Sequence, residues 1–118
     1  MNIEGLRTFC LSLKGTTEEL PFDNKTLVFK VLGKMFALTD IDDFESINVK
    51  CEPEKAIELR EKYSSVKAGY HMSKKHWNTI DVNSELTDTE IKQWILHSYD
   101  LVASKLSKSE KAILNELS

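Results

Sequence analysis

Hydrophobic and polar residues alternate along this chain with two periods, one typical of helices and the other of strands. Apolar residues recur at helical spacing over residues 3–13, with Asn2 in place as N-cap and Gly15 as terminator. The same spacing returns over residues 53–63, which a proline opens, and over residues 91–105. We therefore expect three amphipathic helices, each with one apolar face for a core.

The long third helix and a shorter helix after it each begin with a capping signal. Thr87 precedes Glu90 by three residues, so its hydroxyl can accept from the Glu90 amide while the carboxylate reaches back. Ser107 and Glu110 repeat this spacing and predict a short last helix.

Segments that are rich in β-branched and aromatic residues, or that alternate strictly, predict five strands. They are residues 26–32, 35–39, 46–51, 64–71 and 77–82. The first two form a hairpin about a turn at Gly33 and Lys34. The clean alternation in the third places Ile47, Val49 and Cys51 on a packed sheet face and their neighbours in water.

The predicted elements follow one another in the order α-βββ-α-ββ-α. Separate hairpin-type strands with few helices favour an α+β class and an antiparallel sheet. A length of 118 residues suits one domain, which we expect to span residues 1–118. We therefore predict a five-stranded antiparallel sheet with helices on one face.

Composition is that of an ordinary globular protein, with 41% hydrophobic and 30% charged residues. No apolar run approaches the roughly 20 residues that a bilayer-spanning helix needs. The first residues also lack the basic and apolar parts of a signal peptide. We expect a cytoplasmic protein without membrane contact. Cys10 and Cys51, on a predicted helix and strand, are expected to be small core residues.

The net charge of −3 argues against a surface that binds nucleic acid everywhere, but one stretch is basic. Residues 60–75 carry five lysine or arginine side chains and one acid. The acids gather in residues 40–45, 52–54 and 81–90. This pattern fits an anionic partner, although a solvated charged face is the simpler interpretation.

One run, residues 69–79, contains two of the three histidines, one of the two tryptophans and two adjacent lysines. His71 and His76 are five residues apart, which does not place both side chains on one side of a strand or helix. No CxxC or HExxH motif accompanies them, so neither a metal site nor a cofactor is expected. Ser73 has no nucleophile elbow or glycine-rich loop around it, so we do not expect an enzyme.

The same run has the composition of a nucleic-acid-binding surface. Lys74 and Lys75 are expected on the turn between the last two strands, where they would contact phosphates. Trp77 has the opposite strand parity from Ile80 and Val82, which would place it on the wet sheet face. The alternative is that Trp77 is a core anchor, since tryptophan is highly buried on average.

Several segments together resemble the MmcQ/YjbR family of small bacterial proteins. They are LPF (20–22), FKV (29–31), GKMFAL (33–38), INVKC (47–51), PE (53–54), GYHMSKKHWNT (69–79) and HSYDLV (97–102). The resemblance implies a two-layer fold similar to that of secretion chaperones. It also implies DNA binding, by analogy with a double wing. The wings would be the turns at Lys74 with Lys75 and at Gly33 with Lys34.

These observations lead to the hypothesis of a non-enzymatic module that binds DNA weakly. Lysines would contact phosphates, the histidines would bond phosphate or bases, and Trp77 would stack or buttress. The residues expected in contact are Lys34, Lys67, His71, Lys74, Lys75, His76 and Trp77. The rival hypothesis is a protein-interaction or chaperone-like module without nucleic-acid affinity. A monomer or weak dimer is expected in either case.

Overall fold

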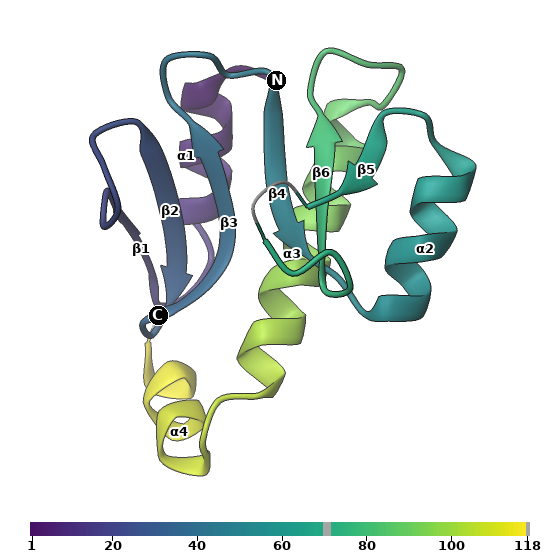
Figure 1. Ribbon diagram of the computed structural model, residues 1–118. Coiled ribbons are helices and arrows are strands. Elements are labelled where there is room, and N and C mark those ends of the chain that lie inside the picture. The colour runs from purple at the N-terminus through teal and green to yellow at the C-terminus, as the bar shows by residue number, and fades with distance from the viewer. Residues whose placement is uncertain (70–71, 118) are drawn as a thin grey trace.

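The computed structural model describes residues 1–69 and 72–117, and within them six strands form one antiparallel sheet (Figure 1). The strands are β1 (Thr16–Glu19), β2 (Thr26–Val31), β3 (Lys34–Asp40), β4 (Ser46–Lys50), β5 (Val66–Ala68) and β6 (Trp77–Asp81). The helices are α1 (Ile3–Leu11), α2 (Pro53–Lys62), α3 (Asp88–Ser104) and α4 (Lys108–Glu116). The strands lie in the order β1-β2-β3-β4-β6-β5, with every neighbouring pair antiparallel.

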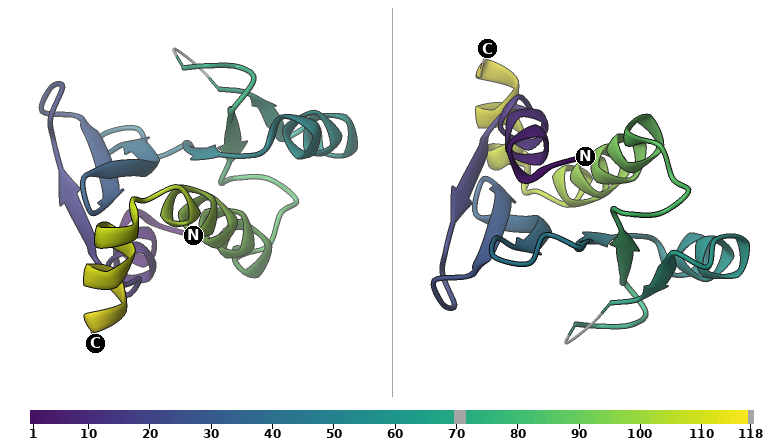
Figure 2. Two further views of the ribbon diagram at one scale, coloured as in Figure 1. Left: turned by 90° about the horizontal axis from the view of Figure 1, so that it is seen from below. Right: turned by 90° about the horizontal axis from the view of Figure 1, so that it is seen from above.

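Helices cover one face of the sheet, as predicted. Views from the two ends of the molecule show α1 and α3 on the same side of the sheet, while α2 stands beside the edge strand β5 (Figure 2). Residues 72–76, which lead into β6, lie on the opposite side of the sheet (Figure 2). The α+β class and the layered arrangement are therefore confirmed. None of the described helices is long and apolar enough to cross a membrane.

Local capping interactions start three helices as the sequence predicts. The Asn2 side chain accepts a hydrogen bond from the Gly5 amide at 2.8 Å. Thr87 accepts from the Glu90 amide at 3.1 Å, and the Glu90 carboxylate accepts from the Thr87 amide at 3.0 Å. The box at Ser107 has the same two bonds. These bonds satisfy amides that the first helical turn would otherwise leave unpaired.

The core lies between the sheet and the layer formed by α1 and α3. Alternate strand residues point into it, and they meet apolar side chains from both helices. Its largest fully buried side chains are Leu6, Phe29, Phe36, Ile47, Ile80, Ile91 and Ile95. Cys10 and Cys51 are free and buried here, which confirms their predicted role.

Two polar side chains of α3 join it to the rest of the fold. The Ser98 hydroxyl donates to the Phe36 carbonyl at 2.5 Å and accepts from the Lys50 amide at 2.8 Å. The Tyr99 hydroxyl donates to the Lys14 carbonyl at 2.6 Å, and its ring meets the Phe36 ring edge-on at 5.4 Å. These contacts fix the position of α3 relative to β3 and β4.

The predicted number of strands was too low by one, because β1 is polar throughout. Its sequence, Thr-Thr-Glu-Glu, contains no buried side chain, and as an edge strand it pairs with β2 alone. Such a segment has neither the apolar alternation nor the residue types that predict strands. A tertiary contact helps to hold it, since Arg7 of α1 donates two hydrogen bonds to the Glu18 carboxylate.

Two turn positions also differ from the prediction. Leu32 and Gly33 have positive φ angles of 45° and 84°, so they form the turn between β2 and β3. Lys34 therefore already belongs to β3. Gly15 does not end the first helix; it turns the chain into β1 with a φ of 71°. Both turns need a residue with left-handed backbone geometry, which glycine adopts easily. The end of a helix also favours glycine for this reason, so the residue type alone does not distinguish a helix end from a turn.

The sheet face away from α1 and α3, here called the open face, carries a row of side chains across five strands. The strand registers place Val28, Leu38, Asn48, Thr79 and Lys67 next to one another in that order. The row is apolar on β2 and β3 and polar on β4, β6 and β5.

Candidate functional site

The two ends of the sheet carry opposite charge. At the lower end in Figure 1, β3 begins with Lys34 and β4 ends with Lys50. At the upper end, β3 and β6 end with Asp40 and Asp81, and residues 41–45 add further acids. Because neighbouring strands run in opposite directions, residues far apart in the sequence meet at each end.

Three lysines and a tryptophan line one hollow at the lower end, with a volume of about 450 Å³. We call this cavity the lysine hollow. Its lining residues are Gly33, Lys34, Met35, Lys50, Trp77, Val102 and Lys105. Among the described residues, no carboxylate belongs to this lining. Lys34 and Lys105 are exposed and Lys50 is half-buried. The nearby Glu110 of α4 has a lowered pKa, chiefly through hydrogen bonds from Ser107 and to a smaller extent through the charge of Lys34.

A different element places each of these lysines. The turn at Leu32 and Gly33 brings Lys34 to the end of the hairpin. The backbone amide of Lys50 is held by the Ser98 hydroxyl, which fixes the end of β4 against α3. Lys105 is the C-cap of α3, where a cation interacts favourably with the helix dipole. The hollow therefore exists only where a hairpin, a central strand and a helix end meet.

Trp77 lies on the open side of the sheet, as its parity predicts, yet it is buried. It pairs with Lys50 across β4 and β6, lies outside the core cluster and is 7% exposed. Gly69 packs against it so closely that a Cβ atom there would lie 2.7 Å from the Trp77 Cβ. The alternative interpretation, that Trp77 anchors the core, is thus wrong about the face of the sheet on which the side chain lies. It is correct that the side chain is buried. Trp77 supports the lysine hollow and does not offer a free ring for stacking.

The turn before β6 presents two more cations. Lys74 and Lys75 are both exposed there. The His76 amide donates to the Ser73 carbonyl at 3.2 Å, which closes the turn. The His76 carbonyl accepts from the Cys51 amide at 2.7 Å, which ties the turn to the end of β4. His76 itself is half-buried.

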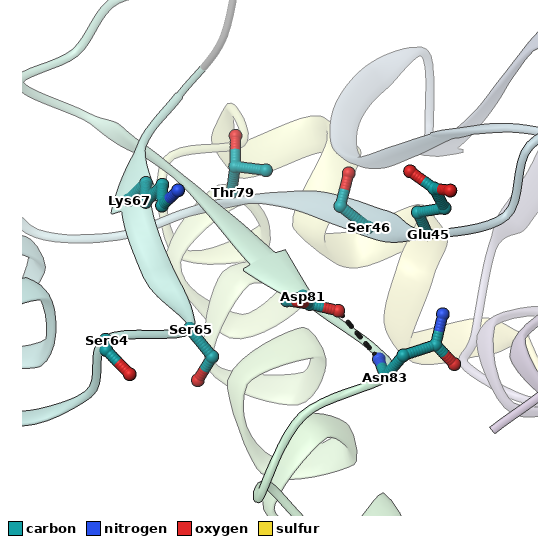
Figure 3. A pocket seen from close by; sticks show the side chains of 8 residues that line it. All are labelled: Glu45, Ser46, Ser64, Ser65, Lys67, Thr79, Asp81 and Asn83. Carbon is teal, nitrogen blue, oxygen red and sulfur yellow. Dashed lines mark hydrogen bonds between the residues drawn. The ribbon is translucent and has the colours of Figure 1, made fainter.

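Lys67 lies apart from the lysine hollow. Its side chain shares a groove at the upper end of the open face with Glu45 and Asp81 (Figure 3). The two carboxylates that line this groove oppose the approach of a phosphate. The structure thus separates Lys67 from Lys34, although both were expected to contact one ligand. His71 lies outside the described residues.

Lys50 and Lys105 belong to the lysine hollow but not to the predicted set. Lys50 had a usable signal, because the alternation of β4 places it on the open face with Asn48. Lys105 had none, since the end of α3 and the start of β3 become neighbours only through packing.

Metal ligands and thiols are the other chemically reactive groups to consider in the described part of the chain. It contains no group of three or more His, Cys, Asp or Glu side chains that could hold a metal ion. Burial raises the pKa of the Cys10 thiol to about 12 and also raises that of Cys51. Both thiols therefore stay protonated near neutral pH and are poor nucleophiles. What the lysine hollow can do is hold an anion.

Comparisons with known proteins agree on one family. A family model described as YjbR matches residues 11–101 of this chain. YbdF of Escherichia coli O157:H7 is 35% identical over 92 residues, which cover 77% of this chain and 75% of that protein. YjbR of Escherichia coli strain K12 is 27% identical over 118 residues, which cover 99% of this chain and 100% of that protein. Both relatives are named as uncharacterised proteins.

Two solved structures are similar to this fold. Protein DR2400 of Deinococcus radiodurans has a TM-score of 0.89 and 37% identity, over 97% of this chain and 88% of that one. A protein from Pseudomonas syringae has a TM-score of 0.72 and 27% identity, over 86% of this chain and 98% of that one.

Proposed function

Because the chain belongs to the YjbR family, we propose that it is a non-enzymatic module that binds nucleic acid through phosphate contacts. The names of its relatives specify no ligand. The observation that carries it is the lysine hollow, in which Lys34, Lys50 and Lys105 converge beside Trp77.

A phosphate is the ligand that this hollow fits best. Three ammonium groups without a carboxylate in the lining create a positive field, although the whole chain has a net charge of −3. A nucleic-acid strand brings a row of phosphates, and each lysine that neutralises one releases counterions. Lys74 and Lys75, on the turn that leads into Trp77, add two exposed cations for neighbouring phosphates.

The charge of the opposite end orients such a ligand. Asp40, Asp81 and the acids of residues 41–45 repel phosphates from the upper end of the sheet. A strand is therefore expected to lie across the lower end, with its phosphates toward the lysines.

Fluorescence anisotropy with a labelled oligonucleotide, repeated from about 50 to 200 mM salt, tests the proposal. We expect affinity to fall steeply with salt. Lys34→Gln should weaken binding and lower the salt slope by about 1, because one phosphate contact is lost. Lys25→Gln is the matched control, since it removes the same charge at the other end of the sheet, near Asp23 and Asp40. No binding by the unaltered protein at the lowest salt, or equal losses in both variants, would contradict the proposal.

A further inference from the structure

A second hollow, of about 580 Å³, lies on the open face, and the proposed phosphate contacts do not use it. Its size is typical of sites for small ligands. We propose that this open-face hollow takes one unstacked nucleobase, so that the preferred ligand is single-stranded nucleic acid. The inference rests on the proposed function and names its ligand more closely.

The lining of the open-face hollow combines apolar and polar side chains, and the apolar ones suit a flat ring. These apolar side chains are Phe22, Met35, Leu38 and Met72. Phe22 is 66% exposed, an unusual state for a large aromatic side chain, so its ring is available to a planar ligand. Methionine side chains adapt to the faces and edges of aromatic rings. Stacking on an exposed aromatic ring is the main way in which proteins hold bases of single strands.

The floor of the hollow presents an oriented amide. The Thr79 hydroxyl donates to the Asn48 Oδ1 at 2.5 Å, which holds the amide in one orientation. Asn48 lines the hollow, and its Nδ2 group has no hydrogen-bond partner among the described residues. An amide group has hydrogen-bond donors and an acceptor, and so does the edge of a base. Asparagine side chains therefore form hydrogen bonds with bases.

The open-face hollow adjoins the lysine hollow. Met35 lines both of them. Asn48 and Lys50 lie on the same face of β4, two residues and therefore about 7 Å apart along the strand. A base held at Asn48 thus has its own phosphate within reach of Lys50, which is the spacing that a nucleotide strand requires.

A single strand fits this arrangement better than a duplex. In a duplex the bases are paired and stacked, and extruding one of them costs free energy that a single strand does not have to supply. Asp40, which lines the open-face hollow, repels phosphate, so the backbone stays on the lysine side while only a base enters.

Anisotropy titrations with a short single strand and with the duplex of the same sequence test the inference. We expect the single strand to bind more tightly. Phe22→Ala should lower its affinity roughly 5- to 150-fold, the range for one lost base stack, and leave duplex binding unchanged. Ile57→Ala is the control, because it truncates an apolar side chain of α2 that is 52% exposed. Phe22 is largely exposed, so its truncation should not unfold the protein.

The possible failures are distinguishable. If neither form of DNA binds, the proposed function itself is wrong. If binding depends on Lys34 but is equal for both forms and unchanged in Phe22→Ala, only the inference is overturned. An abasic strand that competes as well as the intact strand would overturn it in the same way. If Phe22→Ala alters only self-association in sedimentation, the open-face hollow is a protein contact and the inference also fails.

Discussion

Ser98 shows how one buried hydroxyl can position a functional residue. It bonds the Phe36 carbonyl on β3 and the Lys50 amide on β4, so one side chain of α3 holds two strands. Because Lys50 lines the lysine hollow, these bonds also fix part of its wall. Helical periodicity places residue 98 on the buried face, but the partners of its hydroxyl depend on how the helix packs.

Removing this hydroxyl should destabilise the fold clearly. Ser98→Ala leaves a buried carbonyl and a part-buried amide without their partner, and we expect the free energy of unfolding to fall by about 2 kcal/mol. Urea denaturation measures this loss. Ser104→Ala is the matched control, because within the described residues its exposed hydroxyl bonds only the Leu101 carbonyl of its own helix. That control should change stability by less than about 0.5 kcal/mol, and equal losses would disprove the role of Ser98.

For Trp77, the sequence predicts the face of the sheet but not the burial of the side chain. Strand parity correctly predicts its face, because side chains alternate with a period of two in any strand. Gly69, which lies eight positions earlier, packs against it where β5 and β6 pair, and its amide donates to the Trp77 carbonyl at 2.8 Å. The pattern of residue types in the sequence does not reveal how closely Gly69 lies to Trp77.

At the scale of elements, carboxylates that cap helices and turns have lowered pKa values. Hydrogen bonds from backbone amides are the largest cause for Asp23, Asp40, Glu90 and Glu110. A carboxyl group whose pKa is lower in the folded state stabilises the fold above its unfolded pKa. It loses this contribution as the pH falls through the folded pKa.

The stability of the protein should therefore decline in acid. We expect the thermal midpoint to begin falling near the ordinary carboxyl pKa values of 4.5 and 3.8, and to keep falling below them. Glu90→Gln keeps an acceptor at this position of the capping box but cannot titrate, so its decline should be shallower. Melting curves followed by circular dichroism from pH 7 to about pH 3 test this. A decline identical to that of the unaltered protein would refute the role of Glu90.

The elements themselves could be predicted wherever local pattern is strong. Capping boxes identified the starts of α3 and α4, and alternation identified the buried face of β4. β1 was missed because an edge strand needs neither apolar alternation nor a buried side chain. It forms because β2 offers a free edge and Arg7 binds Glu18, and both are properties of the assembled sheet.

At the scale of the whole molecule, the opposite charges of the two sheet ends should control association with nucleic acid. Asp43→Asn at the acidic end is expected to raise the association rate at low salt up to roughly twofold. Lys105→Gln at the basic end should lower it by a similar factor. Stopped-flow association with labelled DNA measures both rates, and both differences should fade at high salt. Rate changes of the same sign in the two variants would rule out this steering.

Local periodicity and capping motifs were enough to predict the class of the fold, the order of its main elements and the cysteines of the core. They suffice because burial and backbone hydrogen bonding act on short stretches of chain. The candidate site was only partly predictable. Lys34 and Trp77 came from local pattern and family resemblance, whereas Lys105 joined them and Lys67 separated from them only in the folded chain. Convergence of this kind depends on strand order and helix packing, which bring together residues that no local pattern connects.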